Sequence, residues 1–576
     1  MNIIIKTIRF IKEILPQKYK VRAIFVSFLL FVNSGLELIG LGAILPLFVV
    51  LLENSVVEKY QWAAWMYEQF YLTDERQLIV ILAIAFFIVI AIKNLLGLWI
   101  TKIQSEFSFS LFKIFTVQLH QLYYLNGYTF FKGTNSNVVV RDIRLAPERF
   151  AQALVLGSLT FLNEIILLAA IIIGITLYNY EIFLLLIVTV LPPFIIFYRW
   201  VRKRSIILGE IKNKIEPIIG KNLFQSIFGF VDIMISGAEK TFRNRIEDNL
   251  EELVDVNIKT NIYNMAPTRV IETSLMFAIA IIISFGIFYL PSKTDLIKLL
   301  GLFVLAGYRI MPSINRMMLA INNLNQNIWV FDVLSPLIGF KEKHSKEIKE
   351  LNFENQLQLE SINFSYPNCE EDVLKNYSLE IKKGEVVGLI GPSGAGKTTV
   401  MNILLGFLKP TKGFYKIDGV ILSEEYMASF YKKIGYVQQQ VYLIDASLAE
   451  NIAFGLEISQ LDLNKLEKVL IQASLWDFVQ TLPEGIYTMI GENGAKLSGG
   501  QRQRVGIARA LYFDAEILFF DEATSSLDNE TEKEITEAIR KLSDGNLTMI
   551  IIAHRLSTLE GCSKIIKIDR KEKELH

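Results

Sequence analysis

Residues 391–398 read Gly-Pro-Ser-Gly-Ala-Gly-Lys-Thr and have the spacing of a loop that binds phosphate groups. In the pattern G-x-x-x-x-G-K-[ST], glycines let backbone N–H groups face the phosphates of a nucleotide, the lysine reaches the terminal phosphates and the last hydroxyl lies on Mg²⁺. The segment therefore predicts a site for ATP and Mg²⁺, with Thr398 as a metal ligand. Its predicted members are Gly391, Pro392, Ser393, Gly394, Ala395, Gly396, Lys397, Thr398 and Thr399.

Two neighbouring carboxylates, Asp521 and Glu522, follow the apolar run at residues 517–520. The run predicts a buried strand that delivers the first carboxylate to Mg²⁺ and the second to the water that attacks the γ-phosphate. Phosphoryl transfer requires charge neutralisation and an aligned water rather than covalent help. We therefore assign Asp521 to the metal and Glu522 to catalysis. For either carboxylate alone, a strand end that turns into solvent would be the simpler interpretation.

A third segment, residues 497–501, supplies donors of another kind. Ser498 and the backbone of two glycines could donate hydrogen bonds to a γ-phosphate, but the spacing suggests that one folded copy cannot bring this segment to the loop at 391–398. The ATPase is therefore predicted to be a homodimer with two composite sites, each completed by the facing chain. The ATP-binding residues of this segment are Leu497, Ser498, Gly499, Gly500 and Gln501.

The elements around the loop agree with this interpretation. Residues 385–390 predict a buried strand, and residues 399–408 predict the helix that follows the loop. The alternative is a glycine-rich turn placed there by chance.

With these motifs in this order along the chain, residues 357–570 resemble the nucleotide-binding domain of an ABC transporter. The resemblance implies that Tyr366 stacks on adenine and that Gln439 is the Q-loop glutamine, which acts in catalysis and on the metal. It also implies that Asp528 is the aspartate of the D-loop and that His554 senses the γ-phosphate. A surface tyrosine and a structural histidine are the alternatives. Gln438 is a minor alternative to Gln439, because the family's usual proline is absent before it.

The first half of the chain is too apolar for a soluble enzyme. Hydrophobic residues make up 52% of the chain and charged residues 20%, and the mean hydropathy is +0.37. Stretches of about 18 or more apolar residues predict transmembrane helices, and buried core helices are a poor alternative because six in one half leave no polar residues to cover them. The predicted spans lie near 23–52, 78–101, 153–178, 182–199, 270–290 and 296–318.

The predicted fold class is an α-helical transmembrane domain of six spans, of the exporter type, followed by an α/β P-loop ATPase domain with an ABC helical subdomain. We divide the chain into an amphipathic cytoplasmic segment at 1–22, the transmembrane domain at 23–325, a linker at 326–355 and the nucleotide-binding domain at 356–576.

Loop charges predict the orientation. Lys and Arg are concentrated in residues 1–22, 102–150 and 199–260, whereas the alternate connections hold few of them. The N-terminus and the ATPase domain are therefore expected in the cytoplasm of a bacterial cell, at its inner membrane. Two long cytoplasmic connections turn near residues 128–134 and 214–228, and these turns are expected to couple the two domains. The basic residues are interpreted as anchors at the inner face of the membrane, so nucleic acid is not expected as a partner.

Four cations lie within or at the ends of the predicted spans, where each costs about 2.5–3.5 kcal/mol on insertion scales. Such residues are functional candidates, and together they could form a substrate cavity for a phosphate or pyrophosphate group. The candidate cations are Lys93, Arg269, Arg309 and Arg316. The alternative is internal pairing with Glu37, Glu164 and Glu272.

Residues 37–46 and 308–316, with a short outer helix indicated by Trp62, Met66 and Phe70, resemble bacterial PglK-type lipid-linked oligosaccharide flippases. The resemblance implies an ATP-driven flippase that moves a polyprenyl-pyrophosphate-linked oligosaccharide from the inner to the outer leaflet. The sequence departs from that family at Lys93, where an arginine is expected, and at Arg269, which is shifted by one position. A lipid A, drug or peptide exporter is the alternative, and a regulatory membrane ATPase that does not transport is the third hypothesis.

Overall fold

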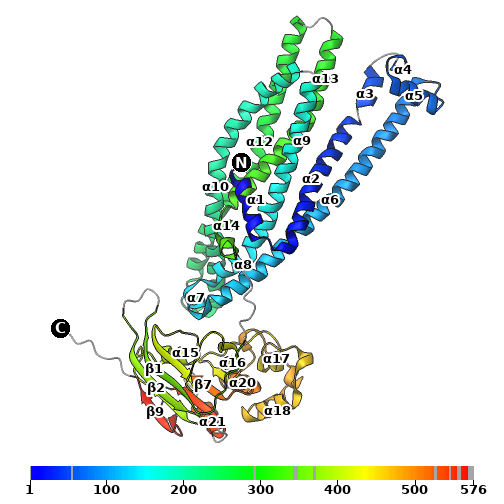
Figure 1. The fold of residues 1–576 in the computed structure, drawn as a ribbon. Coiled ribbons are helices and arrows are strands. Elements are labelled where there is room, and N and C mark those ends of the chain that lie inside the picture. Colours follow the sequence, from blue (N-terminus) through cyan, green and yellow to red (C-terminus); the bar gives the residue numbers. More distant parts are fainter. Residues whose placement is uncertain are drawn as a thin grey trace. The chain divides into compact units, whose positions relative to one another are not determined.

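The computed structural model describes residues 2–43, 45–52, 56–178, 180–289, 293–340, 348–366, 371–523, 529–543, 547–553, 555 and 559–568 (Figure 1). The chain divides into two compact units. The first comprises Met1–Asn126 and Phe130–Glu342, and the second comprises Gly127–Thr129 and Lys343–His576.

The first unit is helical throughout its described part. Its elements are α1 (Asn2–Ile14), α2 (Gln17–Gly42), α3 (Leu45–Leu52), α4 (Val56–Lys59), α5 (Gln61–Gln69), α6 (Glu75–Leu125), most of α7 (Gly127–Gly133), α8 (Ser136–Arg149), a π-helix (Phe150–Leu156), α9 (Gly157–Tyr178), α10 (Tyr180–Phe228), α11 (Phe230–Ile235), α12 (Glu239–Tyr289), α13 (Lys293–Gln326), α14 (Val330–Leu334) and a 3₁₀ turn (Ser335–Leu337).

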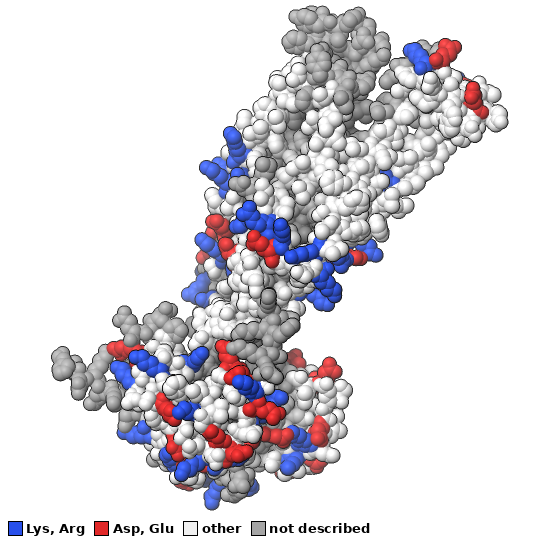
Figure 2. Space-filling model, in the orientation of Figure 1, with Lys and Arg blue, Asp and Glu red and all other residues white. Residues whose placement is uncertain are grey.

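Four stretches within the described residues are helical, long and apolar enough to cross a membrane: Gln17–Gly40, Arg76–Leu125, Ser136–Gly174 and Glu239–Ser284. The predicted spans near 182–199 and 296–318 fall within α10 and α13, where many side chains lie outside the described residues. On the face shown in Figure 2, Lys and Arg gather toward the end of the first unit at which α1 and α8 lie, and long stretches of α2 and α6 beyond it carry few charged side chains.

The predicted first span, 23–52, is divided in the structure. The helix α2 ends at Gly42, and α3 begins at Leu45 with Pro46 in its first turn. Proline is tolerated in the first turn of a helix because it has no N–H to donate, but it cannot continue a helix from the preceding turn without loss of a hydrogen bond. The short outer helix that the aromatic spacing predicts is present as α5.

The amphipathic N-terminal segment forms α1, which packs its apolar side on the first unit. Phe10 is buried, and its ring lies 5.2 Å from that of Phe331 and 5.8 Å from that of Phe150. Phe150 also meets Phe115 edge to face, at 5.4 Å. The helix α9 contacts α2, α10 and α13, so it connects the pair α2 and α6 to the remaining long helices.

The second unit is an α/β domain with two sheets. A four-stranded antiparallel sheet has the order β2-β1-β4-β5, and a five-stranded parallel sheet has the order β6-β7-β8-β3-β9. The strands are β1 (Gln356–Phe364), β2 (Leu374–Lys382), β3 (Val386–Ile390), β4 (Lys412–Ile417), β5 (Val420–Ile421), β6 (Ile434–Val437), β7 (Ile517–Asp521), β8 (Thr548–Ile552) and β9 (Lys564–Lys567). The strands β3, β7 and β8 are almost wholly buried, as expected for parallel strands covered on both faces.

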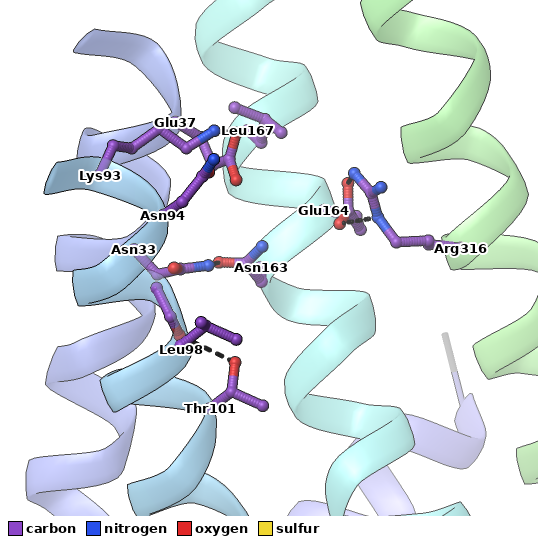
Figure 3. Close-up of a pocket in the computed structure, with 11 residues that line it drawn as sticks. Asn33, Glu37, Lys93, Asn94, Leu98, Thr101, Asn163, Glu164, Leu167 and Arg316 are labelled. Atoms are coloured by element: carbon purple, nitrogen blue, oxygen red, sulfur yellow. Dashed lines mark hydrogen bonds and ion pairs between the residues drawn. The ribbon is translucent and has the colours of Figure 1, made fainter. Parts of the chain in front are cut away.

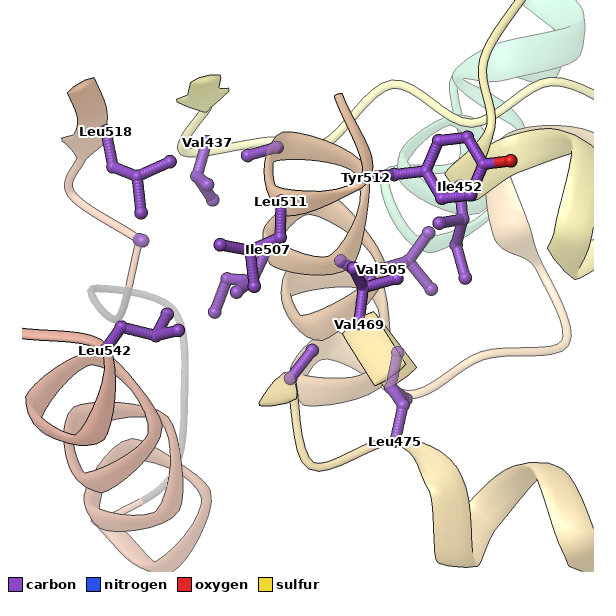
Figure 4. Packing of buried hydrophobic residues seen from close by; sticks show 14 of the residues in the cluster. Val437, Ile452, Val469, Leu475, Val505, Ile507, Leu511, Tyr512, Leu518 and Leu542 are labelled. Carbon is purple, nitrogen blue, oxygen red and sulfur yellow. The ribbon is translucent and has the colours of Figure 1, made fainter. Parts of the chain in front are cut away.

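The helices of this unit are α15 (Lys397–Leu404), α16 (Met427–Tyr431), α17 (Leu448–Ile452), α18 (Leu463–Gln472), α19 (Trp476–Thr481), α20 (Gly499–Tyr512) and α21 (Asn529–Ser543), with 3₁₀ turns at Ile458–Gln460, Gly485–Tyr487 and Glu492–Gly494. The helix α20 connects the parallel sheet with the helical part of the domain. Figure 4 shows its Ile507 and Leu511 directed toward Val437 of β6 and Leu518 of β7, while Val505 lies near Val469 of α18.

The three residues Gly127–Thr129 belong to the second unit. Within that unit the Tyr128 ring stacks on Phe407, with centroids 5.4 Å apart and planes 13° apart. Tyr128 lies in one of the two turns that the sequence suggests as coupling elements.

Candidate functional site

The glycine-rich loop lies between the end of β3 and the start of α15, at the carboxyl edge of the parallel sheet. This edge is where parallel α/β domains place their ligands. The backbone at Gly391 lies so close to Ile568 that a Cβ at this position would be 2.3 Å from the Ile568 carbonyl oxygen. Only glycine fits there without a shift of the backbone. Gly394 and Gly396 have φ angles of 80° and 101°, which side chains rarely adopt. The loop conformation thus depends on its glycines.

Lys397 folds back over this loop. Its ammonium donates to the carbonyl oxygens of Gly391 at 2.9 Å and Pro392 at 3.2 Å, and the side chain is buried. An ammonium group held by two neutral carbonyls can exchange them for charged phosphate oxygens, which form stronger hydrogen bonds. The hydroxyl of Tyr366 lies 3.2 Å from that of Thr399, so the predicted adenine-stacking residue reaches the helix that follows the loop.

Asp521 is the last residue of β7 and lies in a partly buried position. Burial raises the pKa of its carboxyl group, and the nearby Glu522 raises it further, while a 3.3 Å hydrogen bond from the Tyr436 hydroxyl and the charge of Lys397 lower it. The predicted metal ligands Thr398, Gln439 and Asp521 all offer oxygen atoms. Mg²⁺ is usually held by one or two carboxylates together with phosphate oxygens, so this donor set fits it.

Glu522 is held at both its backbone and its side chain. Its φ angle is 49°, and its N–H donates to the Ile552 carbonyl oxygen of β8 at 3.0 Å. The side-chain amide of Gln439 donates to its carboxylate, at 3.0 Å. The structure thus brings the predicted catalytic glutamate and the Q-loop glutamine together. A non-glycine residue with positive φ is uncommon, and such positions concentrate at functional sites.

The third segment forms the beginning of α20. Ser498 is the N-cap: its hydroxyl accepts from the Gln501 N–H at 3.2 Å, and the Gln501 side chain accepts from the Ser498 N–H at 2.8 Å. This reciprocal capping box fixes the helix start. Ser498 is exposed, and the following Gly499 and Gly500 lie at a helix end whose free N–H groups and dipole favour anions.

Three predicted residues are not described. Asp528 and His554 lie outside the described residues, as does the Arg309 side chain. Tyr436 and Gln503, in contrast, contact the site in the structure although the sequence did not indicate them.

A cavity of about 410 Å³ lies within the first unit, between α2, α6, α9 and α13. Figure 3 shows two charged pairs directed into this region, one on each side of α9. The cavity is lined by Asn33, Glu37, Lys93, Asn94, Gly97, Leu98, Thr101, Asn163, Glu164, Leu167 and Arg316. Of the four candidate cations, Lys93 and Arg316 line it.

The internal pairing that the sequence left open is present in the structure. The Lys93 ammonium lies 2.9 Å from a Glu37 oxygen, and Arg316 holds Glu164 with hydrogen bonds of 2.6 and 3.2 Å. Among the described residues, this cavity therefore contains two balanced ion pairs. The physical reason is that a charge within an apolar bundle is tolerated mainly when it is paired.

Arg269 is not part of this cavity lining. Its side chain is 80% exposed and pairs with Glu272 on the same helix at 3.1 Å. An exposed pair of this kind is worth little. The predicted role of Arg269 in a substrate cavity formed by two chains stays a prediction.

Several neutral polar residues of the cavity were missed from the sequence. The Asn33 amide donates to the Asn163 side-chain oxygen at 3.1 Å, and the Ser34 hydroxyl lies 3.2 Å from the same oxygen. Asn94 and Thr101 also line the cavity. Asparagine within an apolar span was the available signal, because such amides require hydrogen-bond partners away from water.

Comparison with known proteins defines the class. Residues 374–525, which include the glycine-rich loop, Ser498 and Glu522, match the family described as ABC transporter. The fold is similar to that of a bacterial Atm1-family ABC exporter with ATP bound, with a TM-score of 0.74 and 22% identity over 96% of this chain and 94% of that one. The chain thus has the ABC exporter fold: a helical membrane-type domain followed by an ABC nucleotide-binding domain. The predicted fold class is confirmed.

Relatives in sequence carry a more specific name. The chain is 32% identical to the ATP-dependent lipid A-core flippase of Cupriavidus metallidurans over 348 residues, or 60% of this chain and 58% of the relative. It is 31% identical to that of Dechloromonas aromatica over 376 residues, 65% of this chain and 63% of the relative. The identity to the ATP-dependent lipid A-core flippase of Alkalilimnicola ehrlichii is 46% over 213 residues, which cover 37% of this chain and 36% of the relative. The chain thus matches less than two thirds of the length of each of these relatives.

Proposed function

We propose that this protein is an ATP-driven exporter that works as a homodimer in a bacterial inner membrane and moves a lipid between leaflets. The observation that carries the proposal is the joint presence of a complete set of phosphate-site motifs in the second unit and a polar, charged cavity among the apolar helices of the first. A hydrolase without transport would have no use for that cavity.

In this proposal each group of the ATP site has one task. Lys397 neutralises phosphate charge, Glu522 polarises the attacking water and His554 senses the γ-phosphate. Ser498 of a second chain, with the N–H groups of Gly499 and Gly500, completes each composite site. When bound with the nucleotide, Mg²⁺ neutralises further phosphate charge, and Thr398, Gln439 and Asp521 are the residues that would hold it.

We propose that the transported lipid has a phosphorylated saccharide headgroup of the lipid A type. The named relatives support the lipid A alternative better than the oligosaccharide flippase that the sequence favoured. Both substrates share phosphate and sugar hydroxyls. The cavity offers groups that suit both, since Lys93 and Arg316 match phosphate while its amides and the Thr101 hydroxyl match hydroxyls.

The two ion pairs of the cavity determine what the headgroup of such a lipid would have to displace. In the described structure the two cations are held by Glu37 and Glu164, so a phosphate must compete with a carboxylate for each cation. A phosphate carries more charge and offers more acceptor oxygens than a carboxylate, which favours the exchange. Arg309, the candidate of the sixth predicted span, remains a further proposed ligand. Its replacement by Ala should abolish transport and leave basal ATPase activity intact.

The test is reconstituted transport. Proteoliposomes that contain the protein should move labelled lipid A between leaflets in the presence of Mg-ATP, and the Glu522→Gln variant should not. Parallel liposomes with a polyprenyl-pyrophosphate oligosaccharide distinguish the two lipid classes. ATP hydrolysis without movement of either lipid would instead support the regulatory ATPase.

A further inference from the structure

The side chain of Gln503 connects α20 with the loop that follows β6. Its amide nitrogen donates to the carbonyl oxygen of Gln439 at 2.6 Å and lies 3.4 Å from that of Gln438. Gln503 is only 4% exposed, and its side-chain oxygen has no hydrogen-bond partner within the described part of the chain. A buried amide with an unused acceptor is costly to a fold, so its position calls for an explanation.

The surrounding contact between α20 and β6 is close. A Cβ on Gly506 of α20 would lie 2.8 Å from Val441, and a Cβ on Gly435 of β6 would lie 2.7 Å from the Ala510 Cβ. Arg509 adds a second polar link, since its guanidinium donates to the Tyr442 carbonyl oxygen at 2.9 Å. The helix therefore holds the loop at both ends, through Gln503 at residues 438–439 and through Arg509 at residue 442.

The held loop contacts the catalytic carboxylate. Gln439 uses its backbone oxygen for Gln503 and its side-chain amide for the Glu522 carboxylate, at 3.0 Å. The Glu522 backbone is fixed by its bond to Ile552 of β8. The position of the Glu522 side chain relative to the site therefore depends on Gln439, and that of Gln439 depends on Gln503.

We propose that Gln503 is a positioning residue for ATP hydrolysis, which acts through Gln439 to place the Glu522 carboxylate. This inference rests on the proposed role of Glu522 in polarising the attacking water. It also connects the segment at residues 497–501, through α20, to the catalytic glutamate of the same chain. Ser498 and Gln503 lie less than two turns apart on one helix, so a shift of the helix start on contact with the partner's nucleotide would move the loop at 438–439.

The decisive variant is Gln503→Met in the full chain, which keeps the length of the side chain and removes its donor. We expect kcat for ATP to fall about tenfold or more, because misplacement of a catalytic group by about 1 Å can cost up to about a hundredfold. The KM for ATP should change by less than about threefold, since the groups that bind phosphate remain. Gln472→Met, the same change at an exposed position of α18, should match the wild type.

A double-mutant cycle separates positioning from a purely structural role. If Gln503 acts through Gln439, the Gln503→Met/Gln439→Ala variant should be no slower than Gln439→Ala alone. Additive losses would overturn the proposal, as would a kcat of Gln503→Met equal to the wild type. Hydrogen exchange of residues 438–443 in the nucleotide-free protein should also increase in Gln503→Met, independently of activity, and unchanged exchange would count against the link.

A second variant of Gln503 and the Glu522→Gln variant separate a failure of this inference from a failure of the proposed role of Glu522. Gln503→Leu removes the donor and keeps an apolar side chain of similar bulk, so it decides the question if the Met variant does not fold; full activity of the Leu variant would overturn the proposal. If the wild type hydrolyses ATP and Glu522→Gln does not, the proposed role of Glu522 stands whatever Gln503 does. Equal rates for the wild type and Glu522→Gln would instead remove the basis of both.

Discussion

Arg316 on α13 holds the carboxylate of Glu164 on α9 with two hydrogen bonds, of 2.6 Å from Nε and 3.2 Å from Nη2. The Glu164 side chain is only 4% exposed, whereas that of Arg316 is 42% exposed. The cation is thus the more accessible partner, and the carboxylate behind it keeps the charge balanced. Arg316 is therefore the partner that an entering anion could reach more easily, and Figure 3 shows it directed toward Glu164.

Removal of Arg316 should destabilise the protein more than removal of both partners. Arg316→Ala leaves Glu164 buried without a counter-ion, and we expect a loss on the order of 2 kcal/mol, below that of a fully buried pair because the guanidinium is partly solvated. The Arg316→Ala/Glu164→Leu variant should recover most of that loss. Thermal unfolding of detergent-solubilised protein measures both. A double variant as unstable as the sum of the two single changes would contradict the pairing.

The pair between Lys93 and Glu37 can be disturbed without changing either residue. A Cβ on Gly40 of α2 would lie 2.9 Å from Lys93 Cδ, so Gly40→Ala should displace this flexible side chain. We expect lipid-stimulated ATPase activity to change while basal activity is retained. Gly35→Ala on the same helix meets no atom within 4 Å and is the matched control, expected to stabilise α2 by about 0.5–1 kcal/mol. Identical stimulation curves for the two variants would remove Lys93 from the substrate site.

At neutral pH, the ionised and partly buried carboxylate of Asp521 is predicted to lower the stability of the fold. Its pKa is raised by burial above the ordinary value of 3.8, so the folded state binds the proton more tightly than the unfolded state. The protonated carboxyl group therefore contributes its stability in full below pH 3.8. This contribution is lost as the pH rises through the pKa of the folded state.

Asp521→Asn removes this effect and keeps an oxygen that can accept from Tyr436. At neutral pH we expect a higher Tm for the nucleotide-free variant and no Mg-dependent ATP hydrolysis. The gain in Tm should shrink as the pH is lowered toward 3.8. Differential scanning fluorimetry over a pH series tests this, and a gain that grows in acid would show the opposite sign.

Tyr366 provides a test of nucleotide stacking. Tyr366→Phe loses the hydroxyl contact with Thr399 but keeps the ring, so ATP affinity should stay close to that of the wild type. Tyr366→Ala should weaken ATP binding by about 1–3 kcal/mol, the usual value of stacking on a base. Equilibrium binding of a fluorescent ATP analogue is the measurement. If the two variants bind equally well, Tyr366 does not stack on adenine.

The ATP-site elements could be predicted closely, because their signals are local. The apolar run 517–520 became β7 with Asp521 as its last residue, and the helix after the loop begins at Lys397, two residues before its predicted start. A strand of buried residues at the core of a parallel sheet, followed by a turn with fixed glycine positions, leaves little freedom in register.

The cavity could be predicted only in part, since its geometry depends on how the helices rotate about their axes. The sequence named Glu37, Glu164 and Glu272 as possible partners but could not assign them, because the residue spacing within one helix says nothing about the facing helix. The π-helix Phe150–Leu156 was missed for a similar reason. Its stability involves a bond from another helix, the 2.6 Å contact of the Ser108 hydroxyl with the Ala151 carbonyl oxygen.

The capping box of Ser498 explains why a hydroxyl suits this position. A serine hydroxyl has two acceptor lone pairs and one proton, and the cap uses only a lone pair, for the Gln501 N–H. In the proposed homodimer, the proton is thus available to a phosphate oxygen of the nucleotide on the facing chain, and no hydrogen bond of the helix start would have to break for this contact. Aspartate would cap α20 as well, but it would place a negative charge opposite the phosphate. In the proposed homodimer, one atom would therefore stabilise the helix of its own chain and bind the nucleotide of the facing chain at the same time.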